Sequence, residues 1–375
     1  MAEVIRHIRQ DEWDIFMQML EKSYGHPVGY FQAHYPEIYL PDYRSDKTFY
    51  VLEKHGKIVS HVGMSSFDLM VEDVKINIGG ILGVATIPEE RNKGYMERLI
   101  SHVITEMEKK DISVSVLWGD RHRYGNLGWE NAGEKMALQF NERSLMKSGV
   151  KPLSQVREVN PIKAVSKVKQ LYIKQRYRVD RGKRLKGILI RADNRVWLGD
   201  DGYLCGKCIG DKLIVNEVVS ESGREASFIM AVMEWCFVKQ AELSICPQDR
   251  DYISRLIGSA YNWEIRHEGM FRINNCYKFL KHFIPFFERK ASELNLGDFS
   301  ISFGLRFNNK GDIIAVSYKS RRMSISRKRM SDYSEIDERE GVRYLIGGIL
   351  PDKKIFGIFS TLLPIPFHIP ELDSI

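Results

Sequence analysis

Residues 83–99 read Gly-Val-Ala-Thr-Ile-Pro-Glu-Glu-Arg-Asn-Lys-Gly-Tyr-Met-Glu-Arg-Leu, and this stretch decides the fold. The apolar run at residues 81–86 predicts a buried strand, and the polar turn Arg91–Gly94 opens directly into a helix. The apolar residues of that helix recur at helical spacing and form one stripe: Tyr95, Met96, Leu99, Ile100, Val103, Ile104 and Met107.

A strand, a glycine-containing turn and a helix N-terminus together predict an anion site. The first backbone N–H groups of a helix have no partner within the helix, and the helix dipole favours negative charge there. Gly94 leaves the backbone open to a ligand, and Arg91 and Lys93 add positive charge. The sequence therefore predicts that this turn holds a phosphate group.

The turn is neither a P-loop nor a dinucleotide fingerprint, because G-x-x-x-x-G-K-[ST] and G-x-G-x-x-G are both missing. It resembles the acetyl-CoA loop of the GCN5-related N-acetyltransferases (GNAT), whose pattern is R/Q-x-x-G-x-G/A after a strand. Arg91, Asn92, Lys93 and Gly94 match the first four positions. Met96 departs from the pattern, because the family has a small residue there.

Downstream residues extend this resemblance. Ile112, Val114 and Val116 alternate as in a strand, and Trp118–Trp129 follows. This segment is similar to the end of a GNAT domain, where a helix carrying a tyrosine leads into the last strand. Tyr124, Gly128 and Trp129 occupy the corresponding Y-x-x-x-G-[FWY] positions.

Upstream, a helix is predicted over Trp13–Tyr24. Two hairpins follow, one over residues 48–64 and one over residues 67–78. The resulting order of helix, strands, helix and strand over residues 1–145 is that of the GNAT fold.

Composition limits the class of protein. A chain of 375 residues with 43% hydrophobic residues predicts two or three domains with buried cores. The sequence has no apolar run of 18 residues and no signal-like N-terminus, so we expect no membrane partner. Five cysteines, a sparse and odd number, fit a reducing compartment, so we expect a cytoplasmic protein. The net charge of +7 suits an anionic ligand such as coenzyme A. Residues 163–186 and 321–329 are basic but lack interleaved stacking aromatics, so no nucleic-acid partner is expected.

We predict a mixed α/β chain of tandem GNAT folds followed by a third α/β domain. Residues 1–150 form the catalytic GNAT domain, and residues 151–275 form a degenerate GNAT copy that lacks a cofactor turn. Helix Ile162–Val179, helix Ser227–Lys239 and the strands between them carry the second copy.

Residues 276–375 are predicted to begin with a helix, Tyr277–Ala291, and to continue with a hairpin and a helix near Ser334–Ile346. This order resembles a sterol-carrier-like domain. The whole arrangement is similar to the enhanced-intracellular-survival (Eis) subfamily of GNAT enzymes, which implies a homo-oligomer, often a hexamer.

The resemblance implies the site residues of an acetyltransferase. Tyr124 is the expected general acid, because a phenol is protonated at neutral pH and can protonate a departing thiolate. The expected acetyl-CoA contacts lie on the strand, on the turn and helix start, and after the next strand: Val84, Ala85, Thr86, Arg91, Asn92, Lys93, Gly94, Tyr95, Met96, Glu97, Gly119 and Asp120.

The general base is less defined by the sequence. In the subfamily the C-terminal carboxylate reaches the active site, and here that group belongs to Ile375. His61 is the alternative base, although a strand histidine with its hydrogen bonds satisfied is the plainer interpretation.

The pair Cys205 and Cys208 has no second ligand pair, so we predict ordinary strand cysteines and no metal.

We therefore predict an enzyme, an N-acetyltransferase that moves an acetyl group from acetyl-CoA to a primary amine by direct attack in a ternary complex. The acceptor is an aminoglycoside-like amine or a lysine or peptide amine. The alternatives are a regulatory protein that binds acetyl-CoA without turnover and a protein whose sterol-carrier-like domain binds an apolar ligand.

Overall fold

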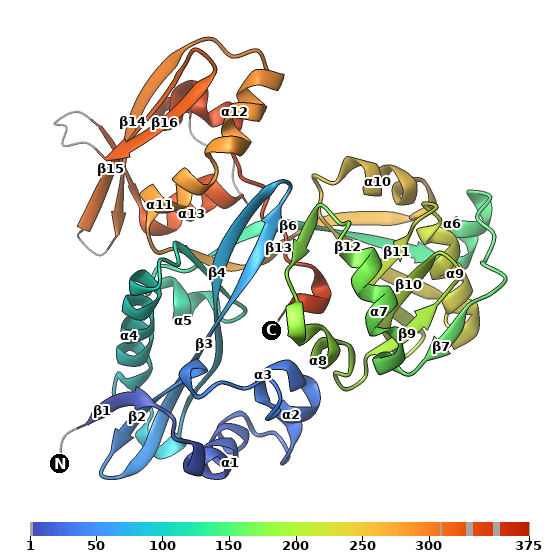
Figure 1. Ribbon diagram of the computed structural model, residues 1–375, viewed down its shortest axis with the longest axis horizontal. Helices are drawn as coiled ribbons and strands as arrows, with labels where there is room; N and C mark the ends of the chain where they lie inside the picture. Colours follow the sequence, from blue (N-terminus) through green and yellow to red (C-terminus); the bar gives the residue numbers. More distant parts are fainter. Residues whose placement is uncertain (1–2, 308–309, 328–332, 348–352, 375) are drawn as a thin grey trace.

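The computed structural model describes residues 3–307, 310–327, 333–347 and 353–374 (Figure 1). The chain begins with a short edge strand and the helix predicted over Trp13–Tyr24, which is confirmed as α1. Two short helices lead from α1 into the sheet: α2 (Tyr30–His34) and α3 (Pro36–Tyr39). The edge strand is β1 (Val4–His7), and the elements after α3 are β2 (Phe49–Lys54), β3 (Lys57–Val71), β4 (Val74–Thr86), α4 (Tyr95–Lys109), β5 (Val114–Leu117), α5 (Arg121–Gly125) and β6 (Glu130–Asn141). The quoted stretch lies on the end of β4 and the start of α4.

Both predicted hairpins are present, β2–β3 over residues 54–57 and β3–β4 over residues 72–73, and they share β3. β3 runs for 15 residues and β4 for 13, and they pair antiparallel from Ser60 with Thr86 to Val71 with Val74. The sequence prediction divided each strand in two at its glycines and serines, but these residues continue the strand. Gly79 and Gly80 lie inside β4, where Gly79 faces the Met107 side chain of α4 too closely for a Cβ atom.

The middle of the chain adds a second set of elements: β7 (Arg157–Val159), α7 (Pro161–Tyr172), β8 (Tyr177–Val179), α8 (Leu185–Leu189), β9 (Arg195–Leu198), β10 (Gly202–Ile209), β11 (Lys212–Ser220), α9 (Glu225–Cys236), β12 (Gln240–Ile245), α10 (Arg250–Leu256) and β13 (Asn262–Ile273). The prediction of one helix over Ile162–Val179 is wrong at its end. α7 stops at Tyr172, and β8 pairs with the distal end of β3. The buried side chains of Tyr177 and Val179 make this tertiary pairing more favourable than a longer helix.

One continuous sheet joins both sets of elements. Its path is β1-β2-β3-β4-β5-β13-β6-β12-β11-β10-β9-β7, with β8 attached to β3. β13 lies between β5 and β6, and β6 in turn pairs with β12. The last strand of each half is therefore built into the sheet of the other half.

The C-terminal lobe has its own sheet of four strands in the order β16-β15-β14-β17 among the described residues. Its elements are α11 (Cys276–His282), α12 (Ile284–Glu293), β14 (Phe299–Phe307), β15 (Lys310–Lys319), β16 (Arg322–Arg327), β17 (Ser334–Asp337), α13 (Glu338–Ile346) and α14 (Lys353–Phe356). The single helix predicted over Tyr277–Ala291 is two helices, because Pro285 begins a new one. The helix predicted from Ser334 begins at Glu338, after β17.

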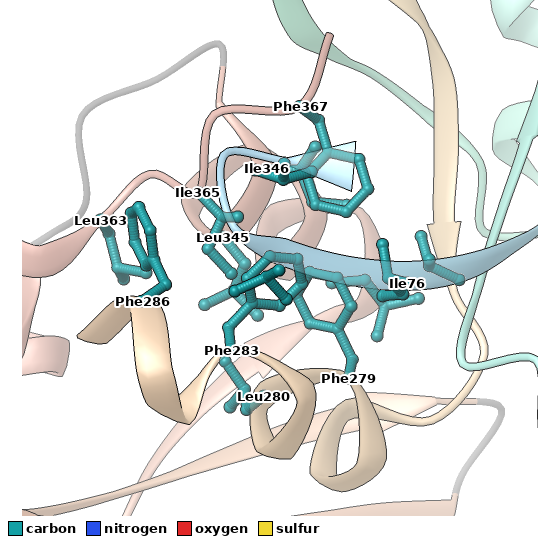
Figure 2. Close-up of a cluster of buried hydrophobic side chains, with 14 of the residues drawn as sticks. Ile76, Phe279, Leu280, Phe283, Phe286, Leu345, Ile346, Leu363, Ile365 and Phe367 are labelled. Carbon is teal, nitrogen blue, oxygen red and sulfur yellow. The ribbon is translucent and has the colours of Figure 1, made fainter. Parts of the chain in front are cut away.

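The lobe shares a core with the distal half of the β3–β4 hairpin (Figure 2). Phe279 and Phe283 of the lobe pack beside Ile76 of β4 and Phe367 of the tail. The lobe is therefore held to the main sheet by buried apolar surface. Within the described ranges, none of the helices has the length and apolar character needed to cross a membrane.

Candidate active site

A cleft of about 560 Å³ opens where β4 ends and α4 begins. Its lining comes from the end of α1, the end of β4, the turn before α4, the first turn of α4 and α5: Ser23, Tyr24, Val84, Ala85, Thr86, Glu90, Arg91, Asn92, Lys93, Gly94, Tyr95, Met96, Glu97, Arg123 and Tyr124. The quoted motif therefore forms most of one concave surface.

The cleft exists because β4 and β5 separate. Their parallel pairing covers only Ile78–Gly80 with Val114–Val116, so the last residues of β4 continue without β5 beside them. The β3–β4 register also shifts between His61 and Gly63. Gly83 lies at this bulge with φ of +58°, and a Cβ atom there would come within 2.8 Å of the Tyr39 hydroxyl. The bulge changes the direction of Val84–Thr86 and places these residues in the cleft wall.

The turn before α4 uses left-handed backbone. Asn92 and Gly94 have φ of +63° and +75°, and Gly94 is the residue immediately before the helix. Space around Gly94 is open, so its backbone faces the cleft without obstruction. The 15-residue α4 then presents its N-terminal N–H groups and positive dipole end to the same volume.

The two basic side chains of the turn, Arg91 and Lys93, differ in how firmly they are held. Arg91 donates to the Thr86 carbonyl and to the Ser23 carbonyl, both at 3.2 Å, and so ties the turn to β4 and α1. Lys93 bonds Glu90 at 2.9 Å, and its side chain remains 45% exposed. Lys93 can therefore turn toward an anion in the cleft.

Tyr124 stands on α5, opposite the turn. Asp120 caps this short helix by accepting from the Arg123 N–H at 2.8 Å. Gly119 lets the Tyr124 ring approach the backbone, since a Cβ atom there would lie 2.5 Å from the ring. Burial raises the pKa of Tyr124, and the nearby Arg123 offsets part of that effect. The phenol therefore stays protonated at neutral pH.

Sequence reasoning missed Tyr24, the last residue of α1. Its hydroxyl donates to the Val84 carbonyl at 2.9 Å, which fixes the end of β4 across the cleft. Burial raises the pKa of Tyr24, and the nearby Tyr124 phenol adds to the effect. Helical spacing gives no signal for this contact, because it depends on the bulge in β4.

The structure brings together in the cleft ten of the expected cofactor contacts, Val84–Thr86 and Arg91–Glu97, with the expected acid Tyr124. Gly119 and Asp120 are not among the described residues that line it. They support Tyr124 instead: Gly119 leaves room for the Tyr124 ring, and Asp120 caps the N-terminus of α5. Ile375 lies outside the described residues.

His61 is fully buried beside Phe16 and Phe49. Its Nδ1 atom contacts the Tyr50 carbonyl at 3.0 Å, and burial lowers the pKa of His61 to about 4. It does not line the cleft, so its environment is that of a strand histidine in the core.

The described end of the tail is anchored by charge. Arg181, with a side chain 2% exposed, bonds Asp373 at 2.7 Å and Glu217 at 2.6 Å. Arg191 donates to the Ser374 carbonyl at 3.1 Å and pairs with Glu37 of α3 at 2.6 Å. Ser374 is therefore linked through Arg191 to α3, one of the short helices that follow α1.

The two halves of the sheet differ in the size of the cavity beside their parallel strand pair. The cavity beside β11 and β12 measures only about 50 Å³, and His368 and Pro370 of the tail line it. The cysteines form no disulfide among the described residues, and Cys205 is buried in β10. Among the described residues, His, Cys, Asp and Glu form no group of three that could hold a metal ion.

Residues 4–132 match the family model described as an acetyltransferase (GNAT) domain. No curated protein sequence matches the chain. GNAT structures from Anabaena variabilis and Kribbella flavida are each 16% identical, with TM-scores of 0.74 and 0.72, and cover 100% of both chains. Eis1 from Mycobacterium abscessus is 12% identical with a TM-score of 0.67, covering 98% of this chain and 99% of its own.

The chain thus carries a GNAT acetyltransferase domain and is an acyltransferase enzyme. The similarity to the solved structures concerns the fold and extends over the whole chain, which confirms the expected mixed α/β, GNAT-like architecture.

Proposed function

We propose that this enzyme transfers the acetyl group of acetyl-CoA to a primary amine by direct attack in a ternary complex. The observation that carries the proposal is the shared cleft: a helix N-terminus with basic residues, the separated end of β4 and a protonated phenol all face one volume. A thioester donor that carries a pyrophosphate group, such as acetyl-CoA, needs an anion site, a backbone partner for its extended arm and a proton donor for its leaving thiolate.

The turn holds the anionic part of the donor. Backbone N–H groups from Asn92 to Glu97 meet the pyrophosphate at the start of α4, and Lys93 supplies a positive charge. The end of β4 offers its backbone to the extended pantetheine arm as a neighbouring strand would. Backbone N–H groups of Val84–Thr86 then stabilise negative charge on the thioester oxygen.

The chemistry follows from this placement. The neutral amine attacks the thioester carbonyl carbon and forms the C–N bond, and the C–S bond breaks. Tyr124 gives its phenolic proton to the leaving sulfur, and the proton lost by the amine goes to the general base. For that base we propose the C-terminal carboxylate of Ile375, which is supported by the anchoring of Asp373 on Arg181 and of Ser374 on Arg191, the partner of Glu37 in α3.

We propose that the second half is a GNAT copy without acetyl-CoA. Each half contains one parallel strand pair, β4 with β5 and β11 with β12, followed by a strand exchanged from the other half. The small, tail-lined opening beside β12 supports the absence of a second donor site. We also propose, from the resemblance to the Eis subfamily, a sterol-carrier-like third domain and a homo-oligomer such as a hexamer.

The test is release of free thiol from acetyl-CoA with polyamines, aminoglycosides and lysine peptides as acceptors. Turnover with one acceptor class, and an acetylated product of matching mass, would support the proposal and name the acceptor. Binding of acetyl-CoA without thiol release across all three classes would favour a regulatory protein. Failure to bind acetyl-CoA would overturn the proposed role of the Arg91–Gly94 turn.

A further inference from the structure

We propose that α13 of the C-terminal lobe is a positioning device for Tyr124. This inference rests on the proposed role of Tyr124 as the acid. α5 has only five residues, too few to be rigid without outside support. Its support comes from Glu130 of β6 and from two elements distant in sequence, α13 and β13, which pack against each other.

The first contact is an ion cluster at Glu130, the first residue of β6. Glu130 is 1% exposed and bonds Arg121 of α5 at 2.5 Å, Arg339 of α13 at 2.7 Å and Arg343 of α13 at 3.0 Å. Burial alone would raise the pKa of Glu130, but its hydrogen bonds to Arg121, Asn131 and Arg339 lower it to about 2. One buried carboxylate thus joins the start of α5 to the lobe.

The second contact is made at the end of α5. Gly128 has φ of +88°, and a Cβ atom there would lie 2.3 Å from the Glu338 carboxyl group. Gly125 likewise approaches Arg339, with a Cβ position 3.1 Å from the guanidinium. These two glycines, of which Gly128 belongs to the Tyr124 sequence motif, leave the space into which the first two residues of α13 fit.

A buried arginine completes the support. Arg272 of β13 donates to the Leu127 carbonyl at 3.1 Å and pairs with Glu338 at 2.7 Å. Leu127 N and Trp129 N both donate to the Tyr124 carbonyl, so the turn held by Arg272 is the turn that holds Tyr124. The α13 contacts to Glu130 and Arg272 therefore brace the two groups that hold α5, one at each end of the helix.

The experiment compares two substitutions that each remove an arginine linking the lobe to the rest of the chain. Arg339→Ala removes one α13 bond to Glu130 and the packing against Gly125 of α5, and Arg339→Lys keeps a charge. Arg289→Ala is the matched control, because Arg289 of α12 pairs with Glu72 and Asp73 at the distal turn of the β3–β4 hairpin. We expect Arg339→Ala to lower kcat about tenfold to a hundredfold, with an almost unchanged KM for acetyl-CoA, because misplacement of a reacting group costs that much.

Arg289→Ala should leave both constants within about twofold, and Arg339→Lys should recover part of kcat. The second readout is amide hydrogen exchange over residues 120–129 without substrates, which needs no turnover. Faster exchange there in Arg339→Ala, and not in Arg289→Ala, supports the proposal. Unchanged exchange, or equal loss of kcat in both variants, overturns it. If the wild-type enzyme shows no turnover, the proposed function fails while the exchange result still tests the positioning role.

Discussion

Replacing Tyr124 with phenylalanine removes one hydroxyl group and leaves the ring. The ring is 7% exposed and packs against Gly119, so the fold and the acetyl-CoA affinity should persist. A general acid contributes at least about 100-fold, which corresponds to about 2.7 kcal/mol of barrier. We expect kcat, measured by free-thiol release, to fall by that factor at constant KM for acetyl-CoA.

Tyr24 provides the matched control. Its hydroxyl lies in the same cleft but donates to the Val84 carbonyl, so Tyr24→Phe should cost one hydrogen bond, about 1 kcal/mol or about fivefold in rate. Because the pKa of Tyr124 is raised above the usual 10.0, the phenol keeps its proton at neutral and mildly alkaline pH. Deprotonation of Tyr124 should therefore not lower the rate in that range. If Tyr124→Phe keeps its rate within tenfold while Tyr24→Phe loses more, Tyr24 is the acid and our assignment is wrong.

Three further changes test the turn, the bulge and the ion cluster. Lys93→Ala should weaken acetyl-CoA binding about fivefold at low salt and less at high salt, by calorimetry, and equal affinity at low salt would contradict the turn's role. Gly83→Ala should destabilise the fold by at least about 1–2 kcal/mol in denaturant titrations, because φ of +58° and the Tyr39 hydroxyl both oppose a Cβ atom. Glu130→Gln should cost about 2 kcal/mol at pH 7, since its arginines stay partly exposed. The lowered pKa of Glu130 means that this stability is present above pH 4.5 and is lost as pH falls toward 2, so wild type and variant should converge in acid.

The residues that could be read from the sequence are those whose signal is local. Helical spacing defines α4 from Tyr95, and the Arg91–Gly94 turn carries its own glycine and charges. Tyr124 follows from its motif. Each of these features depends on neighbours within a few positions along the chain.

The features that escaped prediction depend on tertiary pairing. β8 takes Tyr177 and Val179 out of a helical pattern because β3 lies beside it. Tyr24 enters the cleft only because β4 bends at Gly83. Gly119 was expected beside the cofactor, but its space is taken by the Tyr124 ring, a contact that one-dimensional spacing does not encode.

The exchange of strands between the halves explains why the candidate active-site cleft depends on most of the chain. β13 lies against β5, the strand that leads into Tyr124, and its Arg272 holds the turn after α5. The same β13 pairs with β6, whose first residue, Glu130, binds α13 of the lobe. The two later parts of the chain thus both contact the segment around α5, which carries the proposed acid. A GNAT domain that ended with β6 would lose the β13 neighbour of β5, the Arg272 bond to Leu127 and the α13 bonds to Glu130, so the later segments support the candidate site.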